Sequence, residues 1–146
     1  MGNALAPVNI LLVEDNPNDI EITRRALEKG HVRNELTVAR DGQEALDILF
    51  GVKNGNVPKP GLILLDLNLP KVNGHEVLEK IKADPKLRRI PVIVLTASTR
   101  EEDITRTYDL GVNTFISKPV EFEDFIRMVT TIKEYWIVIA TLPPAE

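Results

Sequence analysis

The chain has 146 residues, a length that suits one domain with its own hydrophobic core. Its hydrophobic content of 43% and charged content of 27% are ordinary for a globular domain, and its formal net charge of -4 argues against nucleic-acid binding through a basic surface. The absence of cysteine excludes disulfides, thiolate metal ligands and a cysteine nucleophile. No signal-peptide pattern and no membrane-length apolar run are present, so we expect a cytoplasmic protein without membrane contact.

The first half of the chain alternates apolar runs with helical patterns. Residues 8–13 form an unalternating apolar run, which is typical of a strand buried on both faces. Asn16 followed by Pro17 is a helix N-cap with proline at the first helical position, and this helix should run to about residue 30. Residues 35–39 alternate, which predicts an edge strand, and residues 42–50 have the spacing of a second helix.

The second half continues the same alternation. A stretch rich in glycine, proline and asparagine, residues 51–61, predicts a long surface loop before the third strand. The remaining strands are predicted at residues 62–66, 91–96 and 112–117, and the remaining helices at residues 74–83, 100–110 and from Glu121 onward.

Five strand–helix repeats define the expected fold. Alternating elements of these lengths predict a parallel sheet with helices on both faces, because right-handed crossovers leave few other topologies. We therefore expect an α/β protein of (βα)5 type, with a doubly wound, flavodoxin-like, five-stranded parallel sheet of strand order 2-1-3-4-5. No internal repeat or linker divides the chain, so residues 1–146 are expected to form a single domain.

Polar side chains stand at the carboxyl ends of four predicted strands. Glu14 and Asp15 follow the first strand, Asp66 ends the third, Thr96 ends the fourth and Lys118 follows the fifth. Ligands of open parallel sheets bind at these strand ends. The sequence thus predicts that three carboxylates, a hydroxyl and an ammonium converge at one edge of the sheet.

Such a cluster calls for a cation. Two carboxylates ~4 Å apart repel by roughly 4 kcal/mol at an effective dielectric constant near 20. Mg2+ would relieve this repulsion, because it accepts one or two carboxylates and leaves a position for a phosphate oxygen. Lys118 offers a charge and Thr96 a hydroxyl to the same phosphate. The chain has no GxxxxGK[ST] or GxGxxG motif, so the expected phosphoryl donor is another protein or a small phosphoanhydride, and the acceptor a carboxylate.

The strand-end residues also carry a family resemblance. Their order along the chain resembles that of receiver domains of two-component response regulators, over about residues 8–134. The matching positions are Glu14-Asp15, Asp66, Thr96-Ala97 and Lys118-Pro119.

The resemblance implies a role for each acidic position. Asp66 would accept a phosphoryl group from the histidine of a sensor kinase. Asp15 would bind Mg2+ directly, with Glu14 assisting, often through water. Asp66 itself and the backbone carbonyl of Asn68 would complete the protein ligands.

Further roles follow from the same resemblance. Thr96, the backbone amide of Ala97 and Lys118 would hold the phosphoryl oxygens. Phe115 falls at the family's aromatic switch position, although ordinary packing would also explain a phenylalanine there. The peptide bond between Lys118 and Pro119 is expected to be cis.

The C-terminal part of the chain raises the question of partners. We expect a stand-alone regulator, without a DNA-binding output domain, that signals to a downstream protein. The 51–61 loop together with the 135–144 segment is similar to the small regulators paired with bacterial phytochromes, which suggests a phytochrome-like sensor histidine kinase. The apolar tail could cover the sheet or the end of the last helix, or it could pair with a second copy; we expect a homodimer through Tyr135, Trp136, Ile137, Val138 and Ile139.

Two other functions compete with this interpretation. A pseudo-receiver that only binds proteins normally lacks acidic or lysine positions, and none is missing here. A Mg2+-dependent aspartyl phosphatase usually has a second Asp two residues after its nucleophile, where this chain has Asn68. We therefore expect a switch that catalyses only its own phosphoryl transfer and dephosphorylation. His31 and His75 are expected at the surface, without a role.

Overall fold

The computed structural model describes residues 8–29, 34–96, 114–118, 121–128, 130 and 131. Its strands are β1 (Val8–Val13), β2 (Asn34–Ala39), β3 (Leu62–Leu65), β4 (Val92–Thr96) and β5 (Thr114–Ser117). Its helices are α1 (Pro17–Lys29), α2 (Gly42–Lys53) and α3 (Gly74–Ala83), and helical residues 122–128, 130 and 131 follow β5. The helix expected at residues 100–110 lies outside the described residues.

The five strands form one parallel sheet in the order β2-β1-β3-β4-β5, which confirms the predicted doubly wound topology. Val13, the last residue of β1, is level with Ala39 of β2 and Leu65 of β3. The residues that follow β1 and β3 therefore emerge side by side at one edge of the sheet.

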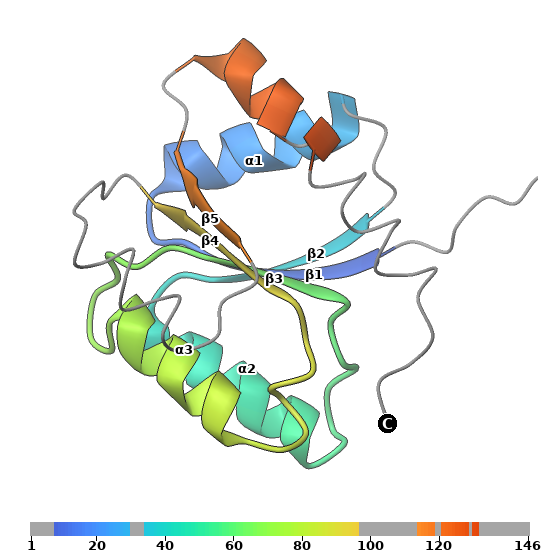
Figure 1. The fold of residues 1–146 in the computed structure, drawn as a ribbon, viewed down its shortest axis with the longest axis vertical. Coiled ribbons are helices and arrows are strands. Elements are labelled where there is room, and N and C mark those ends of the chain that lie inside the picture. Colours follow the sequence, from blue (N-terminus) through green and yellow to red (C-terminus); the bar gives the residue numbers. More distant parts are fainter. Residues whose placement is uncertain (1–7, 30–33, 97–113, 119–120, 129, 132–146) are drawn as a thin grey trace, which may run out of the picture.

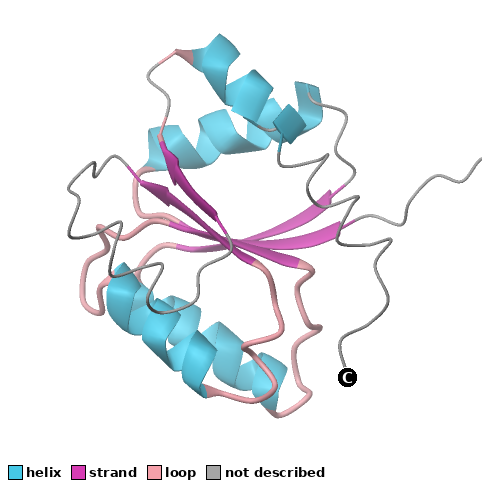
Figure 2. Cartoon of the chain, viewed as in Figure 1, coloured by secondary structure: helices cyan, strands magenta, loops and turns pink. Residues whose placement is uncertain are grey.

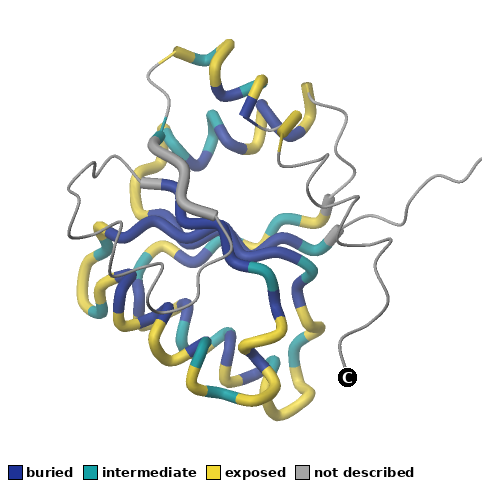
Figure 3. Tube along the Cα trace, viewed as in Figure 1, coloured by how far each residue is buried: buried dark blue, intermediate teal, exposed yellow. Residues whose placement is uncertain are grey.

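Helices cover both faces of the sheet (Figures 1 and 2). The helices α2 and α3 pack on one face, and α1 lies on the other face with the helical residues after β5. The central strands are buried, as Figure 3 shows, because helices cover both faces of the sheet. Successive side chains of a strand point to opposite faces, so each central strand contributes to two cores. Leu11, Ile63 and Val92 belong to the core beneath α2 and α3, whereas Ile10, Leu62 and Ile93 belong to the core beneath α1.

The second helix is longer than predicted, since it ends at Lys53 rather than at residue 50. The chain after it folds back onto the helix, where the backbone N–H groups of Asn56 and Val57 donate to the carbonyl oxygen of Gly51 at 2.8 and 3.0 Å. Gly55, with φ of 85°, provides the left-handed conformation that ends the helix. The expected 51–61 loop is thus reduced to residues 54–61.

His75 is buried, with 8% of its surface exposed, so its prediction as a surface residue is wrong. The reason is the close approach between the start of α3 and the chain after β3, where the Gly74 N–H donates to the carbonyl oxygen of Leu67 at 3.0 Å. His75 follows immediately and is enclosed at this junction. His31 lies outside the described residues.

Candidate functional site

The acidic residues after β1 and β3 are held in place by the sheet itself. The backbone N–H of Glu14 donates to the carbonyl oxygen of Ala39 at 2.9 Å, and that of Asp66 donates to the carbonyl oxygen of Val13 at 3.0 Å. These hydrogen bonds continue the parallel ladders one residue beyond the strands. Glu14 and Asp66 are consequently fixed at the carboxyl edge, with only 3% and 5% of their surfaces exposed.

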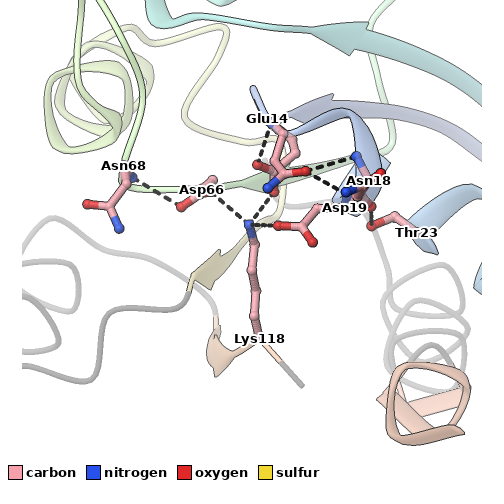
Figure 4. A network of polar contacts seen from close by, with 8 residues as sticks. Glu14, Asn18, Asp19, Thr23, Asp66, Asn68 and Lys118 are labelled. Atoms are coloured by element: carbon pink, nitrogen blue, oxygen red, sulfur yellow. Dashed lines mark hydrogen bonds and ion pairs between the residues drawn. The ribbon is translucent and has the colours of Figure 1, made fainter. Parts of the chain in front are cut away.

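Lys118 lies at the centre of the site (Figure 4). Its Nζ is 2.5 Å from Glu14 Oε1, 2.8 Å from Asp19 Oδ2 and 2.9 Å from Asp66 Oδ2. An ammonium group has three N–H donors, so these three carboxylates use its whole donor capacity. The lysine side chain is largely buried, and the charge of the ammonium is therefore directed inward, at the acidic cluster.

Burial and neighbouring charges shift the protonation of this cluster. Burial raises the pKa of Glu14 to about 7; the Asp66 charge adds to the increase, while the hydrogen bond and charge of Lys118 oppose it. Burial by itself would lower the pKa of Lys118, but hydrogen bonds to Asp19, Glu14 and Asp66 outweigh it and hold that pKa above its usual range. The site thus holds one permanent cation among more carboxylates than it can neutralise.

Three of these residues could hold a metal ion. One carboxylate oxygen each from Glu14, Asp15 and Asp66 lies within 4.8 Å of the other two. Asp15 is exposed, whereas the other two are buried, so the cluster opens to solvent on one side. Hard divalent cations prefer oxygen ligands and can retain water on an open side. The donor set therefore fits a divalent metal site.

The loop after Asp66 is shaped around that carboxylate. The backbone N–H of Asn68 donates to Asp66 Oδ1 at 3.1 Å. The loop then returns to α3, whose N-cap Asn73 accepts a hydrogen bond from the backbone N–H of Glu76. Gly74 permits the return, because a Cβ atom there would lie 2.4 Å from the carbonyl oxygen of Asp66 and 2.5 Å from Leu67 Cα.

The start of α1 brings in a carboxylate that the sequence analysis missed. The side chain of Asn16 accepts hydrogen bonds from the backbone N–H groups of Asn18 and Asp19 at 2.8 and 3.3 Å, which confirms the predicted N-cap. Asp19 then lies in the first turn of α1, facing Lys118. The available signal was only its place in the first turn of a helix that begins directly after the Glu14-Asp15 pair, at the carboxyl edge of the sheet.

The structure brings five predicted site residues together: Glu14, Asp15, Asp66, Asn68 and Lys118. Thr96 and Phe115 are placed only by their backbones, Thr96 level with Ser117 and Phe115 level with Val94. The other predicted site residues lie outside the described residues: Ala97, Pro119, Tyr135, Trp136, Ile137, Val138 and Ile139. The predicted cis bond therefore stays a prediction.

Comparison with known proteins gives consistent matches along the chain. A family model described as response regulator receiver domain matches residues 10–130. The protein named "Probable methanogenesis regulatory protein FilR2" of Methanothrix harundinacea is 47% identical over 131 residues, which cover 90% of this chain and 84% of that protein.

Two further relatives, Rcp1 and RcpA, are similar over nearly the whole length. The response regulator Rcp1 of Synechocystis is 44% identical over 140 residues, with 95% of each chain covered. Its Mn2+-bound crystal structure matches with a TM-score of 0.83 at 43% identity, over 94% of this chain and 100% of that one. The crystal structure of the phosphorylated cyanobacterial phytochrome response regulator RcpA matches with a TM-score of 0.86 at 46% identity, over 95% of this chain and 100% of that one.

This chain therefore belongs to the response regulator receiver domain family. The similarity to regulators paired with phytochromes is also confirmed, since the phytochrome response regulator RcpA matches this chain over almost the whole length of the two proteins. Among the helices that the structure describes, none has the length and apolar character needed to cross a membrane.

Proposed function

We propose that this protein is a phosphorylation switch in which Asp66 accepts a phosphoryl group from a histidine of a sensor kinase, in a Mg2+-dependent reaction. The observation that carries the proposal is the position of Asp66: a buried carboxylate at the end of β3, 2.9 Å from the Lys118 ammonium and beside the Glu14 and Asp15 carboxylates. Membership of the receiver family supports the same assignment.

The transfer is a displacement at phosphorus. A carboxylate oxygen of Asp66 forms the new P–O bond, the P–N bond to the donor histidine breaks, and the released imidazole nitrogen keeps the bonding electron pair and takes up a proton. Asp66 Oδ1 accepts a hydrogen bond from the backbone N–H of Asn68, and Asp66 Oδ2 accepts one from Lys118 Nζ. Both carboxylate oxygens are therefore oriented before the phosphorylated histidine arrives. Lys118 is then in place to pair with the incoming phosphoryl oxygens.

Glu14, Asp15, Asp66 and the backbone carbonyl of Asn68 would hold Mg2+. The mutual approach of the first three carboxylates supports this donor set. Bound there, Mg2+ supplies the positive charge that lets an anionic phosphoryl group approach an acidic site. Asp15 would bind it directly, and Glu14 through water.

The signal would leave the site through β4 and β5. Thr96 ends β4, and it would follow the phosphoryl oxygens together with Lys118 and the amide of Ala97. Phe115 lies in β5 three residues before Lys118, and its side chain would turn into the space that Thr96 vacates. The protein surface next to β4 and β5 would then change, and partner proteins would bind it differently.

The proposed phosphoryl donor is a sensor histidine kinase, and the name of RcpA favours a phytochrome-like kinase. The protein itself is proposed to act in the cytoplasm. Output by protein contact is proposed, with a homodimer formed through residues 135–139.

A pseudo-receiver is disfavoured, because the acidic residues and the lysine come together in one site. An aspartyl phosphatase is disfavoured by Asn68, whose amide lacks the acid–base chemistry of a second Asp.

Incubation with acetyl phosphate and Mg2+, followed by intact-protein mass spectrometry, tests the proposal. We expect the mass of one phosphoryl group to be added, and we expect this addition to disappear on metal chelation and in Asp66→Asn. Asp47→Asn is the matched control, since Asp47 is an exposed carboxylate on α2 whose side chain pairs with Gln43.

A wild-type protein that gains no mass and binds no beryllofluoride would overturn the proposal in favour of the pseudo-receiver. Rapid turnover of many phosphate esters would overturn it in favour of the phosphatase. Retention of the added mass in Asp66→Asn would show that another residue is the acceptor.

A further inference from the structure

Lys118 pairs with three carboxylates, so its ammonium has no N–H donor left for a phosphoryl group. Its three carboxylate partners are Glu14, Asp19 and Asp66. Since an ammonium has three N–H bonds, a phosphoryl oxygen can be bound at full strength only if one of these partners gives way.

The three partners differ in what else they can bind. Glu14 and Asp66 belong to the group of carboxylates that could hold a metal ion, and Asp19 does not. A cation bound between Glu14, Asp15 and Asp66 would offset their charges directly. Asp19 would keep its full attraction for Lys118, from the side of the ammonium opposite Asp66 (Figure 4).

Asp19 is also well anchored for this contact. Its backbone N–H donates to the side chain of the N-cap Asn16, and its carbonyl oxygen accepts the hydroxyl of Thr23 at 2.7 Å. Its side chain is only 27% exposed, and the Oδ2–Nζ distance of 2.8 Å is that of a charge-assisted hydrogen bond. The start of α1 therefore holds the carboxylate at a fixed position beside Lys118.

We propose that Asp19 is a positioning residue that restrains Lys118 by competing with the phosphoryl group for its ammonium. This inference rests on the proposed function. It assigns to α1 a direct influence on how strongly the site retains a phosphoryl group.

The negative charge of Asp19 acts in opposite directions on the two ligands of the site. It attracts a divalent cation, and it both repels an anionic phosphoryl group and withholds Lys118 from it. Neutralising Asp19 should therefore weaken Mg2+ binding and strengthen the binding of a phosphoryl mimic. A residue that served only to stabilise the start of α1 would not produce changes of opposite sign.

The test uses Asp19→Asn, which keeps the shape and a hydrogen-bond acceptor but removes the charge. Isothermal titration calorimetry measures Mg2+ alone, and then beryllofluoride at saturating Mg2+. We expect the dissociation constant for Mg2+ to rise about two- to five-fold and that for beryllofluoride to fall about three- to ten-fold. Glu44→Gln is the matched control, because it removes an acidic charge from the first turn of α2; neither constant should change.

A double-mutant cycle separates action through Lys118 from a general charge effect. If Asp19 acts through Lys118, the gain in beryllofluoride affinity is clearly smaller when Asp19→Asn is made in a Lys118→Met background, where only the direct repulsion of the anion is removed. A gain of the same size in both backgrounds would overturn the positioning role.

Unchanged or weaker beryllofluoride binding in Asp19→Asn would also overturn the inference, whether or not thermal stability falls. Wild-type protein that binds no beryllofluoride at all would instead overturn the proposed function, and this inference with it. The two failures are therefore distinguishable from the wild-type titration.

Discussion

Glu14 and Asp15 are neighbours in the chain, yet they have different environments. Glu14 is buried, pairs with Lys118 and has a pKa raised to about 7 by burial, whereas Asp15 is exposed. Consecutive residues of an extended chain point to opposite sides, so one of an adjacent pair enters the site and the other faces solvent. Burial thus gives the site a carboxyl group with a pKa of about 7.

Glu14 makes the stability of the metal-free protein depend on pH. Because its folded-state pKa of about 7 exceeds the ordinary 4.5, the folded state binds more protons between these values, and the free energy of unfolding falls as pH rises from about 4.5 to about 7. The loss is at most about 3 kcal/mol. Urea unfolding with a chelator at pH 5 and pH 8 should show this decrease, and Glu14→Gln should reduce it.

The other carboxyl groups with shifted pKa values do not affect the change in stability between about pH 4.5 and pH 7. The pKa values of Asp41 and Asp84 lie below the usual range, the first because of the Glu44 backbone N–H and the second because of the Lys53 side chain. Their contributions are therefore lost only at more acidic pH. Equal pH dependence in the wild-type protein and Glu14→Gln would contradict the prediction.

The segment between β3 and α3 shows how a loop can be determined by backbone contacts. It leaves the sheet at Asp66 and returns so closely that the Gly74 N–H donates to the Leu67 carbonyl oxygen at 3.0 Å. A second contact, from the Gly42 N–H to the Pro70 carbonyl oxygen at 3.4 Å, joins it to the start of α2. The position of Asp66 thus depends on two helix starts as well as on its own strand.

Gly74→Ala should disturb the site as well as the fold. The added methyl group would meet backbone atoms of Asp66 and Leu67 at 2.4 and 2.5 Å, and backbone cannot move aside as easily as a side chain. We expect a loss of about 1–3 kcal/mol in the free energy of unfolding, together with weaker beryllofluoride binding. Chemical denaturation and calorimetry measure the two effects.

Gly55→Ala is the control for this variant. It also replaces a glycine, at φ of 85°, but no heavy atom lies within 4 Å of the added group, and the residue follows the C-terminal end of α2 rather than the loop after Asp66. Because an L side chain is strained at this φ, the variant should lower the free energy of unfolding by about 1–2 kcal/mol but leave beryllofluoride affinity unchanged. If both variants bind the mimic like the wild-type protein, the loop does not position Asp66 as described.

At the scale of the whole molecule, the two helical layers offer different surfaces. In the described part of the chain, Phe50 of α2 is the large apolar side chain that remains exposed, at 65%. It borders a groove of about 440 Å3 between α2 and α3, with Leu46, Ile81 and Leu87 among the lining residues. The helical residues 122–128, 130 and 131 lie on the opposite face of the sheet, and the apolar residues 135–139 come later in the sequence, outside the described residues.

The groove between α2 and α3 is thus an alternative interface, against which the proposed dimer through residues 135–139 can be tested. Trp136→Glu should convert a dimer into monomers, because a charge would enter an apolar interface. Phe50→Glu should leave the dimer intact. Multi-angle light scattering with circular dichroism measures mass and folding together. Monomers from Phe50→Glu, with dimers retained in Trp136→Glu, would assign the interface to the α2–α3 groove instead.

The sequence by itself determined the order of elements, the parallel topology and the strand ends at which Asp66 and Lys118 stand. Those features follow from short-range periodicity and from the few connections that a parallel sheet allows. The end of α2 was missed, because it depends on a loop that folds back onto Gly51. The burial of His75 was missed for a similar reason, since it depends on contact between two segments.

Only the tertiary structure decided which carboxylates Lys118 contacts. Asp19 and Lys118 are 99 residues apart, and no local pattern relates them. Their contact depends on where the first turn of α1 is directed after β1 and on the register of β5 beside β4. Sequence periodicity predicts that side chains lie at one edge of a sheet, but a hydrogen bond requires distances within a few tenths of an ångström, which only the packed elements provide.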